Sequence, residues 1–366
     1  MKINPKIICV LLVWAFVLTL ATMIAWWPEA ALSDYDFIEL AMSGTPHVIE
    51  NAINGGANVN ARSRNGTTPL MTAAHWNSNP GVITALIENG ADPNVKNHEG
   101  MTALMWAVHQ NNNPSVITAL VNGGANVEAK DPQGWPMLML AAINGNLEIV
   151  TALIESGADV NAIGPLNTPM LAAVALRGTN PQAITALIEG GANANATISP
   201  SGMPLLMMAA LENVNPQFIA ALIEGGAYVD TRDPTGITIL MTALSRNSSL
   251  ETITALIEGG ADVNARTPDE FTPLWFAVTA SNPEMITALV ENGADVNARG
   301  QHEWTALMMA ATHSSNPEMI SALVRNGADV NARDTWGRTV LTIARTRPSG
   351  NNPNITATLI RHGASE

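Results

Sequence analysis

The chain has 366 residues, of which 47% are hydrophobic, 13% are charged and 4% are aromatic. Its formal charge of −14 argues against binding to nucleic acid, which needs lysines and arginines to neutralise phosphates, and against adhesion to anionic lipid. Cys9 is the only cysteine, so a disulfide framework and a cysteine-based zinc site are both excluded.

The first predicted element is an apolar helix. Residues 7–27 form 21 consecutive positions without a charge, which is long enough to cross a bilayer. Lys2 and Lys6 precede this segment and acidic residues follow it, so we expect the rest of the chain to lie outside the cytoplasm. We expect the protein to meet a membrane only through residues 7–27.

Two interpretations of residues 1–33 remain open. The apolar segment is longer than the ~7–15 residues usual for a secretory signal, which favours a retained signal anchor. Ala31 and Ser33, however, place small residues at the −3 and −1 positions before Asp34, which favours a cleaved signal peptide. We therefore expect an exported protein, either anchored in the inner membrane and facing the periplasm, or periplasmic or secreted after cleavage.

The remainder of the chain repeats itself. A Gly-Ala pair recurs ten times, at spacings between 33 and 36 residues. The glycines of these pairs are Gly56, Gly90, Gly124, Gly157, Gly191, Gly226, Gly260, Gly293, Gly327 and Gly363. A period of this length indicates an array of small structural repeats.

Each repeat is predicted to contain two helices. Thr68 can cap the first helix of one repeat, and Pro69 suits its first position. In most repeats the second helix follows an Asn-Pro pair, whose asparagines are Asn79, Asn113, Asn180, Asn215, Asn282, Asn316 and Asn352. Its apolar side chains, as in residues 83–88, form one buried stripe, and Gly90 supplies the left-handed residue that ends it.

These motifs resemble those of the ankyrin-repeat family over about residues 36–366, and the Asn-Pro pair marks a bacterial-type variant. The turn sequence Asp-Val-Asn-Ala-Arg at 262–266, 295–299 and 329–333 belongs to the same resemblance. The resemblance implies an all-α repeat solenoid, a helix-turn-helix stack of about ten repeats preceded by one transmembrane or signal helix. It implies one domain over 34–366, with repeats that begin near 36, 66, 100, 134, 167, 202, 236, 270, 303 and 337.

The sequence departs from the family pattern inside the first helix. Methionine replaces the histidine of the family's Thr-Pro-Leu-His motif at Met71, Met105, Met139, Met207, Met241 and Met308. We therefore expect thioether packing where the family has hydrogen-bonded histidines. The first repeat is truncated and should act as a cap. The last carries Arg338, Arg345, Arg347 and Arg361, which together with Arg333 form either a polar cap or a docking site for an anionic group.

The resemblance implies binding of a partner through the turn tips and the exposed, concave side of the first helices. The large rings at the tips are Trp135, Phe271, Trp304 and Trp336, and those on the first helices are His75, Trp76 and His109. Large rings at exposed positions are typical of binding anchors. The alternative is that each ring packs over the turn of a neighbouring repeat. Trp106 and Trp275 lie at helix positions that we assign to packing.

We expect no catalytic residue, no cofactor and no metal site. His75 and His109 lie one repeat apart, which separates their rings by roughly 8–10 Å, too far to share a zinc ion. A row of glutamates ends the second helices and forms either an acidic stripe or the solvated back of the array: Glu88, Glu155, Glu189, Glu224, Glu258 and Glu291. The sequence predicts a monomeric, non-catalytic interaction scaffold of the cell envelope, whose partner is another protein. The alternative is a secreted factor that acts on host-cell proteins.

Overall fold

The computed structural model describes residues 32–111, 113–177, 180–198, 200–212, 214–346 and 352–366. The predicted membrane or signal segment, residues 7–27, and the predicted cap residue Arg347 lie outside these ranges. Across the described residues, no helix has the length and apolar character needed to span a bilayer. The chain divides into two compact units, here called the N-terminal unit (through Ala192) and the C-terminal unit (Asn193–Glu366).

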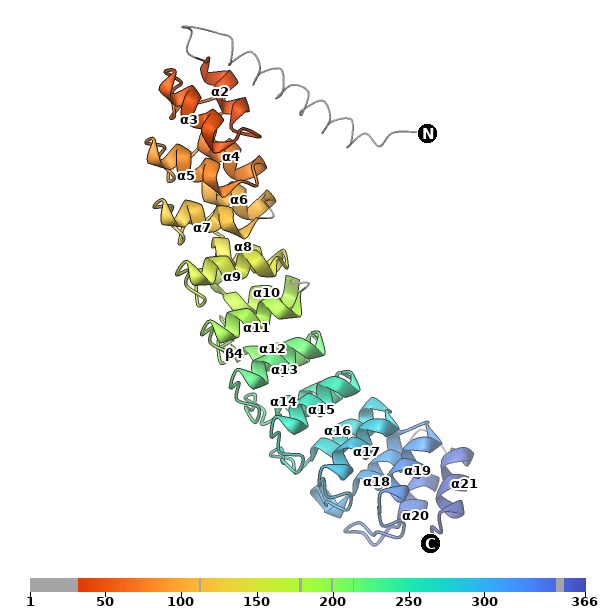
Figure 1. The fold of residues 1–366 in the computed structure, drawn as a ribbon. Helices are drawn as coiled ribbons and strands as arrows, with labels where there is room; N and C mark the ends of the chain where they lie inside the picture. The colour runs from red at the N-terminus through yellow and green to blue at the C-terminus, as the bar shows by residue number, and fades with distance from the viewer. Residues whose placement is uncertain (1–31, 112, 178–179, 199, 213, 347–351) are drawn as a thin grey trace, which may run out of the picture. The chain divides into compact units, whose positions relative to one another are not determined.

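The N-terminal unit consists of helix pairs (Figure 1). The first helices of its repeats are α2 (Asp34–Leu40), α4 (Pro69–Trp76), α6 (Ala103–Gln110), α8 (Met137–Ile143) and α10 (Met170–Arg177). The second helices are α3 (Pro46–Asn54), α5 (Pro80–Glu88), α7 (Pro114–Asn122), α9 (Leu147–Glu155) and α11 (Pro181–Glu189). First helices pack on first helices and second helices on second helices, so the unit has two helical layers.

The C-terminal unit has the same arrangement. Its first helices are α12 (Leu205–Leu211), α14 (Ile239–Ser245), α16 (Pro273–Ala280), α18 (Ala306–His313) and α20 (Val340–Arg345). Its second helices are α13 (Pro216–Glu224), α15 (Leu250–Glu258), α17 (Pro283–Glu291), α19 (Pro317–Arg325) and α21 (Pro353–Arg361). Within this unit too, helices of one kind stack on each other. The predicted stacked helix-turn-helix repeats are confirmed.

The segments that join one repeat to the next, here called tips, contain the only strands of the described chain. In the N-terminal unit β1 (Ile163–Gly164) pairs antiparallel with β2 (Thr168–Pro169), around the 3₁₀ turn η1 (Pro165–Asn167). In the C-terminal unit β3 (Thr197–Ile198) pairs with β4 (Met203–Pro204). A second 3₁₀ turn, η2 (Gln301–Glu303), forms another tip. The tips are therefore short hairpins attached to an otherwise helical array.

The predicted caps form as expected. Thr68 accepts a hydrogen bond from the backbone N–H of Met71, with Pro69 in the first turn of α4. Asn79 accepts one from Gly81 at the start of α5. At the other end of α5, Gly90 has a φ of 96°, and Ala91 N–H donates back to the carbonyl of Leu86. This left-handed glycine therefore ends the helix and turns the chain toward the next tip.

The methionines of the family's histidine slot are core residues. None of the six is more than 3% exposed. Two of their sulfurs also accept hydrogen bonds: the Met105 Sδ from the Thr102 N–H, and the Met207 Sδ from the Thr242 hydroxyl of the next repeat, each at 3.3 Å. Thioether packing thus replaces the histidines, and the Met207 sulfur adds a polar link between repeats. In the repeat that begins near 270, Trp275 occupies the same slot and is 7% exposed, which confirms its assignment to packing.

Candidate functional site

Asparagines at the base of the tips bind each repeat to the next. Asn297 donates from Nδ2 to the carbonyl of Gly327 at 3.0 Å, while its Oδ1 accepts from the Asp329 N–H at 2.8 Å. The same pair of bonds recurs at Asn94, Asn195, Asn264 and Asn331. The asparagine of the Asp-Val-Asn-Ala-Arg motif is therefore a structural residue that fixes the spacing of neighbouring tips.

Two repeats carry a carboxylate in place of this asparagine. Glu128 accepts from the Asp159 N–H at 2.7 Å, and Asp230 accepts from the Asp262 N–H at 2.8 Å. A carboxylate can accept but, when ionised, cannot donate. Each of these repeat junctions therefore keeps one bond of the asparagine pair and lacks the other.

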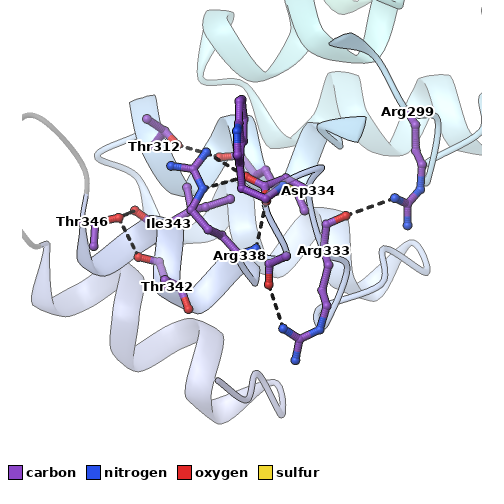
Figure 2. A network of polar contacts seen from close by, with 11 residues as sticks. Arg299, Thr312, Arg333, Asp334, Arg338, Thr342, Ile343 and Thr346 are labelled. Carbon is purple, nitrogen blue, oxygen red and sulfur yellow. Dashed lines mark hydrogen bonds and ion pairs between the residues drawn. The ribbon is translucent and has the colours of Figure 1, made fainter. Parts of the chain in front are cut away.

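We call the repeated asparagine bonds described above the asparagine ladder. Arginines form a second set of repeated bonds, the arginine ladder, along the tips of the C-terminal unit. Arg232 donates to the carbonyl of Arg266, Arg266 to that of Arg299, and Arg299 to that of Arg333, at 2.7 to 3.1 Å. Figure 2 shows Arg299 reaching the main chain of Arg333, which itself donates to Gly337. The arginine of the repeated turn motif thus stabilises the tip, and the ladder gives the tip side chains a rigid base.

Trp336 lies on the tip in which Arg333 donates to the carbonyl of Gly337. Its indole is 60% exposed, with the His302 ring 4.8 Å away on the preceding tip and the Arg338 guanidinium 4.8 Å from its centroid. Arg338 in turn forms an ion pair with the buried carboxylate of Asp334 at 2.7 Å (Figure 2). Burial alone would raise the pKa of Asp334, but hydrogen bonds from Arg338 and from backbone N–H groups outweigh it and lower that pKa. An ionised Asp334 therefore orients the arginine that flanks Trp336.

His75 and Trp76 lie together at the end of α4. The His75 ring stacks on Trp76 at 4.1 Å and on Trp106 of α6 at 4.7 Å, with interplanar angles of 7° and 14°. Trp76 is 61% exposed, Trp106 is half-buried, and burial lowers the pKa of His75. His109 is exposed in the last turn of α6. Trp106 therefore has the packing role predicted for it, and the ring it packs against is that of His75.

Trp135 is half-buried at a tip of the N-terminal unit. The Arg177 guanidinium at the end of α10 lies 5.2 Å from its ring centroid.

Leu166, the middle residue of η1 on the next tip, has a φ of 55° and is 96% exposed. A left-handed leucine in solvent is uncommon, and such positions cluster at functional sites. The sequence does not indicate this exposed position, because Pro-Leu-Asn contains no glycine that would predict a left-handed turn.

The remaining predicted rings, Phe271 and Trp304, are half-buried in the C-terminal unit. Phe271 packs at 4.6 Å against Trp275, so packing accounts for part of its surface. Of the seven predicted residues, Trp76, His109 and Trp336 are exposed and the other four are half-buried. The structure brings His75 and Trp76 into one cluster and gives Trp135 and Trp336 an arginine each.

The two helical layers differ in charge. From α4 onward, the first helices of the described chain contain no Asp or Glu, and their only Lys or Arg residues are Arg177 and Arg345. The second helices carry exposed glutamates, at Glu88, Glu148, Glu155, Glu189, Glu224, Glu251, Glu258, Glu284, Glu291 and Glu318. In each unit, we call the exposed positions of the first helices and the tips the first-helix face of that unit. The helical part of this face, from α4 onward, carries no acidic side chain, whereas the tips keep exposed acidic residues such as Asp92, Glu128, Asp262 and Glu303.

The second helices α5 and α7 enclose a shallow groove of about 770 Å³. Its lining includes Thr84, Ile87, Glu88 and Thr118. Gly123 widens it, because a Cβ atom there would lie 2.3 Å from the Ile87 Cδ1. None of the predicted site residues lines this groove, which belongs to the second-helix layer.

Comparison with known protein families gives one consistent result. A family model described as ankyrin repeats (3 copies) matches residues 37–131, 77–164, 110–198, 138–233, 170–267 and 206–300. A second model, described as ankyrin repeats (many copies), matches residues 289–344. A search of the curated proteins found no match.

Proposed function

The chain belongs to the ankyrin-repeat family, and on that premise we propose that it is a non-catalytic protein-binding scaffold of a bacterial cell envelope. Ankyrin repeats suggest a protein–protein interaction scaffold, and the geometry supports one particular surface for it. We propose that the partner binds the first-helix face.

The difference in charge between the two layers carries this proposal. Charged residues are depleted at the centre of protein interfaces, where aromatic residues and arginine are enriched. The helical part of the first-helix face matches that composition, since it presents Trp76 and Arg177 on helices that lack acidic residues. Trp336 and Leu166 add exposed apolar side chains on the tips. The second-helix layer carries the glutamates and keeps the array soluble. The tips are preorganised by their asparagine and arginine ladders, which lowers the entropy cost of binding.

Affinity capture from the organism's own extract tests the assigned face. The front variant is Trp76→Ala with Trp336→Ala, because both rings are exposed and their loss should leave the core intact. The matched back variant is Glu155→Gln with Glu258→Gln, two exposed second-helix positions. We expect the front variant to lose the partner and the back variant to retain it, with unchanged circular dichroism for both. Loss of the partner in the back variant alone would refute the assignment.

We further propose that residues 7–27 export the chain and hold it in the inner membrane, facing the periplasm. The uncharged length of this segment and the lysines before it support the proposal. Fractionation with protease accessibility tests it: the protein should remain in the membrane fraction and be digested from the periplasmic side. Recovery in the cytoplasmic fraction would contradict export.

A second candidate is a secreted factor that acts on the proteins of a host cell. The small residues Ala31 and Ser33 favour this candidate, because they fit cleavage before Asp34. Protein in the culture medium with Asp34 at its N-terminus would support it, and an intact N-terminus in the membrane fraction would oppose it.

A further inference from the structure

The aromatic stack on α4 and α6 presents one open ring. His75 covers one face of Trp76 in a nearly parallel arrangement at 4.1 Å. Trp76 is nevertheless 61% exposed, so its exposed area belongs to the opposite face and the ring edge. The rings of His75 and Trp106 behind it hold the indole in place, because the three rings form a single stack across two repeats. Trp76 is thus a rigid, flat, apolar platform.

The surroundings of this platform favour a positive charge. Trp76 is the last residue of the eight-residue helix α4, so the negative end of the helix dipole lies beside it. The sequence contains no Lys or Arg from Pro69 to Glu88 or from Ala103 to Asn122. Burial lowers the pKa of His75, which favours the neutral form of the middle ring of the stack. No cationic side chain of these segments therefore competes for the ring or repels a cation.

Two other indoles show how such a ring is used in this protein. Arg177 lies 5.2 Å from the ring of Trp135, and Arg338 lies 4.8 Å from that of Trp336. Both rings therefore carry an arginine supplied by the chain itself. Among the described residues, no such arginine or lysine is found over the ring of Trp76.

We propose that the open face of Trp76 binds an arginine side chain of the protein partner, whose guanidinium stacks on the indole. Arginine fits better than lysine because its planar guanidinium can lie parallel to a ring that is already flat and fixed. The acidic charge of the chain would attract a basic partner segment to this site. This inference rests on the proposed function, and it specifies the chemistry that one part of the first-helix face recognises.

The test uses a short probe peptide and the purified full chain. The probe is acetyl-Gly-Arg-Gly-Arg-Gly-amide, and its matched control replaces both arginines with citrulline, which keeps the shape and removes the charge. Binding is followed through the indole N–H resonance of Trp76, identified by its absence in Trp76→Phe. Thr185→Ala, at an exposed position of the second helix α11, is the control variant outside the proposed binding surface.

We expect the arginine peptide to shift the Trp76 resonance in a saturable way in the millimolar range. Citrulline should weaken the binding about two- to five-fold, as expected for an exposed cation–π contact. Trp76→Ala should abolish the binding measured by the other resonances of α4 and α6, and Trp76→Phe should keep part of it. Thr185→Ala should leave the binding unchanged. Equal shifts with the citrulline peptide, unchanged binding by Trp76→Ala, or no shift of the Trp76 resonance would each overturn the inference. Such a result would leave the capture experiment untouched, so the two proposals fail separately.

Discussion

The asparagine ladder makes a prediction that can be tested in both directions. Asp230→Asn should stabilise the C-terminal unit, because the new Nδ2 group can donate to the next repeat, as Asn297 donates to Gly327. Asn264→Asp should destabilise it, because Asn264 donates to Gly293 at 2.9 Å and a carboxylate cannot. The two substitutions exchange the same atoms at neighbouring junctions.

The magnitude follows from one hydrogen bond. A neutral hydrogen bond contributes about 0.5–1.5 kcal/mol net, and an exposed one lies at the lower end of that range. A change of about 1 kcal/mol shifts the unfolding temperature by roughly 2–4 °C in a unit of this size. We therefore expect Asp230→Asn to raise that temperature by a few degrees and Asn264→Asp to lower it similarly.

Thermal unfolding alone would mix the hydrogen bond with the loss of a negative charge. Glu258→Gln is the matched control, because it removes an exposed charge from α15 without touching the ladder. Hydrogen exchange gives the second measurement: the amides of α14 and α16 should exchange more slowly in Asp230→Asn and faster in Asn264→Asp, because the bond gained or lost is the one from Nδ2 to a glycine carbonyl of the next repeat. Equal effects of Asp230→Asn and Glu258→Gln, with unchanged exchange, would refute the role given to the ladder.

Three further predictions concern the residue that ends α6, the left-handed glycine that follows α15, and the buried aspartate of one tip. Asn111→Ala should destabilise the N-terminal unit by about 2–4 kcal/mol in urea unfolding, because its buried Nδ2 donates to the carbonyls of Ala74 and Asn77 at the C-terminal end of α4. A loss below about 1 kcal/mol would contradict this. Gly260→Ala should cost about 1–2 kcal/mol through backbone strain alone, since φ is 94° and a Cβ meets no atom within 4 Å; thermal unfolding at an unchanged temperature would be the contrary result. Asp334→Asn should cost about 1.5–3 kcal/mol at pH 7 by losing the charged bond to Arg338. The lowered pKa of Asp334 means that its contribution is present above the ordinary aspartate pKa and is lost as the pH falls through the folded value, so the two proteins should converge in acid; a constant difference down to pH 2 would argue against it.

The helices could be predicted because their signals are local. Thr68, Asn79 and Gly90 act on backbone groups within a few residues, so their chemistry can be inferred from spacing alone. The period of the Gly-Ala pair then determines how the helices stack. The fold and the number of repeats therefore follow from the local capping residues and the period of the Gly-Ala pair.

The ladders could not be predicted in the same way. The partner of Asn297 lies 30 residues away along the chain, so only the stacked repeats show that this asparagine is bonded at both ends of its amide. For the same reason Asp230 and Asn264, which occupy equivalent positions of their repeats, form different hydrogen bonds: Asn264 also donates to the next repeat, and Asp230 only accepts.

The candidate site was predicted only in part. Sequence position placed Trp76 and Trp336 at exposed positions, but the stack of Trp106 on His75 depends on rings from two helices. Arg177 and Arg338 are ordinary charged residues until the tips bring them over an indole. Leu166 lies in the left-handed turn η1, which contains no glycine, so the sequence Pro-Leu-Asn does not predict the turn.

Photo-crosslinking in living cells tests the central claim most directly. A photoreactive amino acid is placed at Leu166 or Leu176, two exposed positions of the first-helix face, and at Thr151 or Thr185, two exposed positions of the second helices. If the partner binds the first-helix face, the first two positions should yield the same crosslinked protein and the last two should not. Crosslinks of that protein from Thr151 or Thr185, with none from Leu166 or Leu176, would contradict the account.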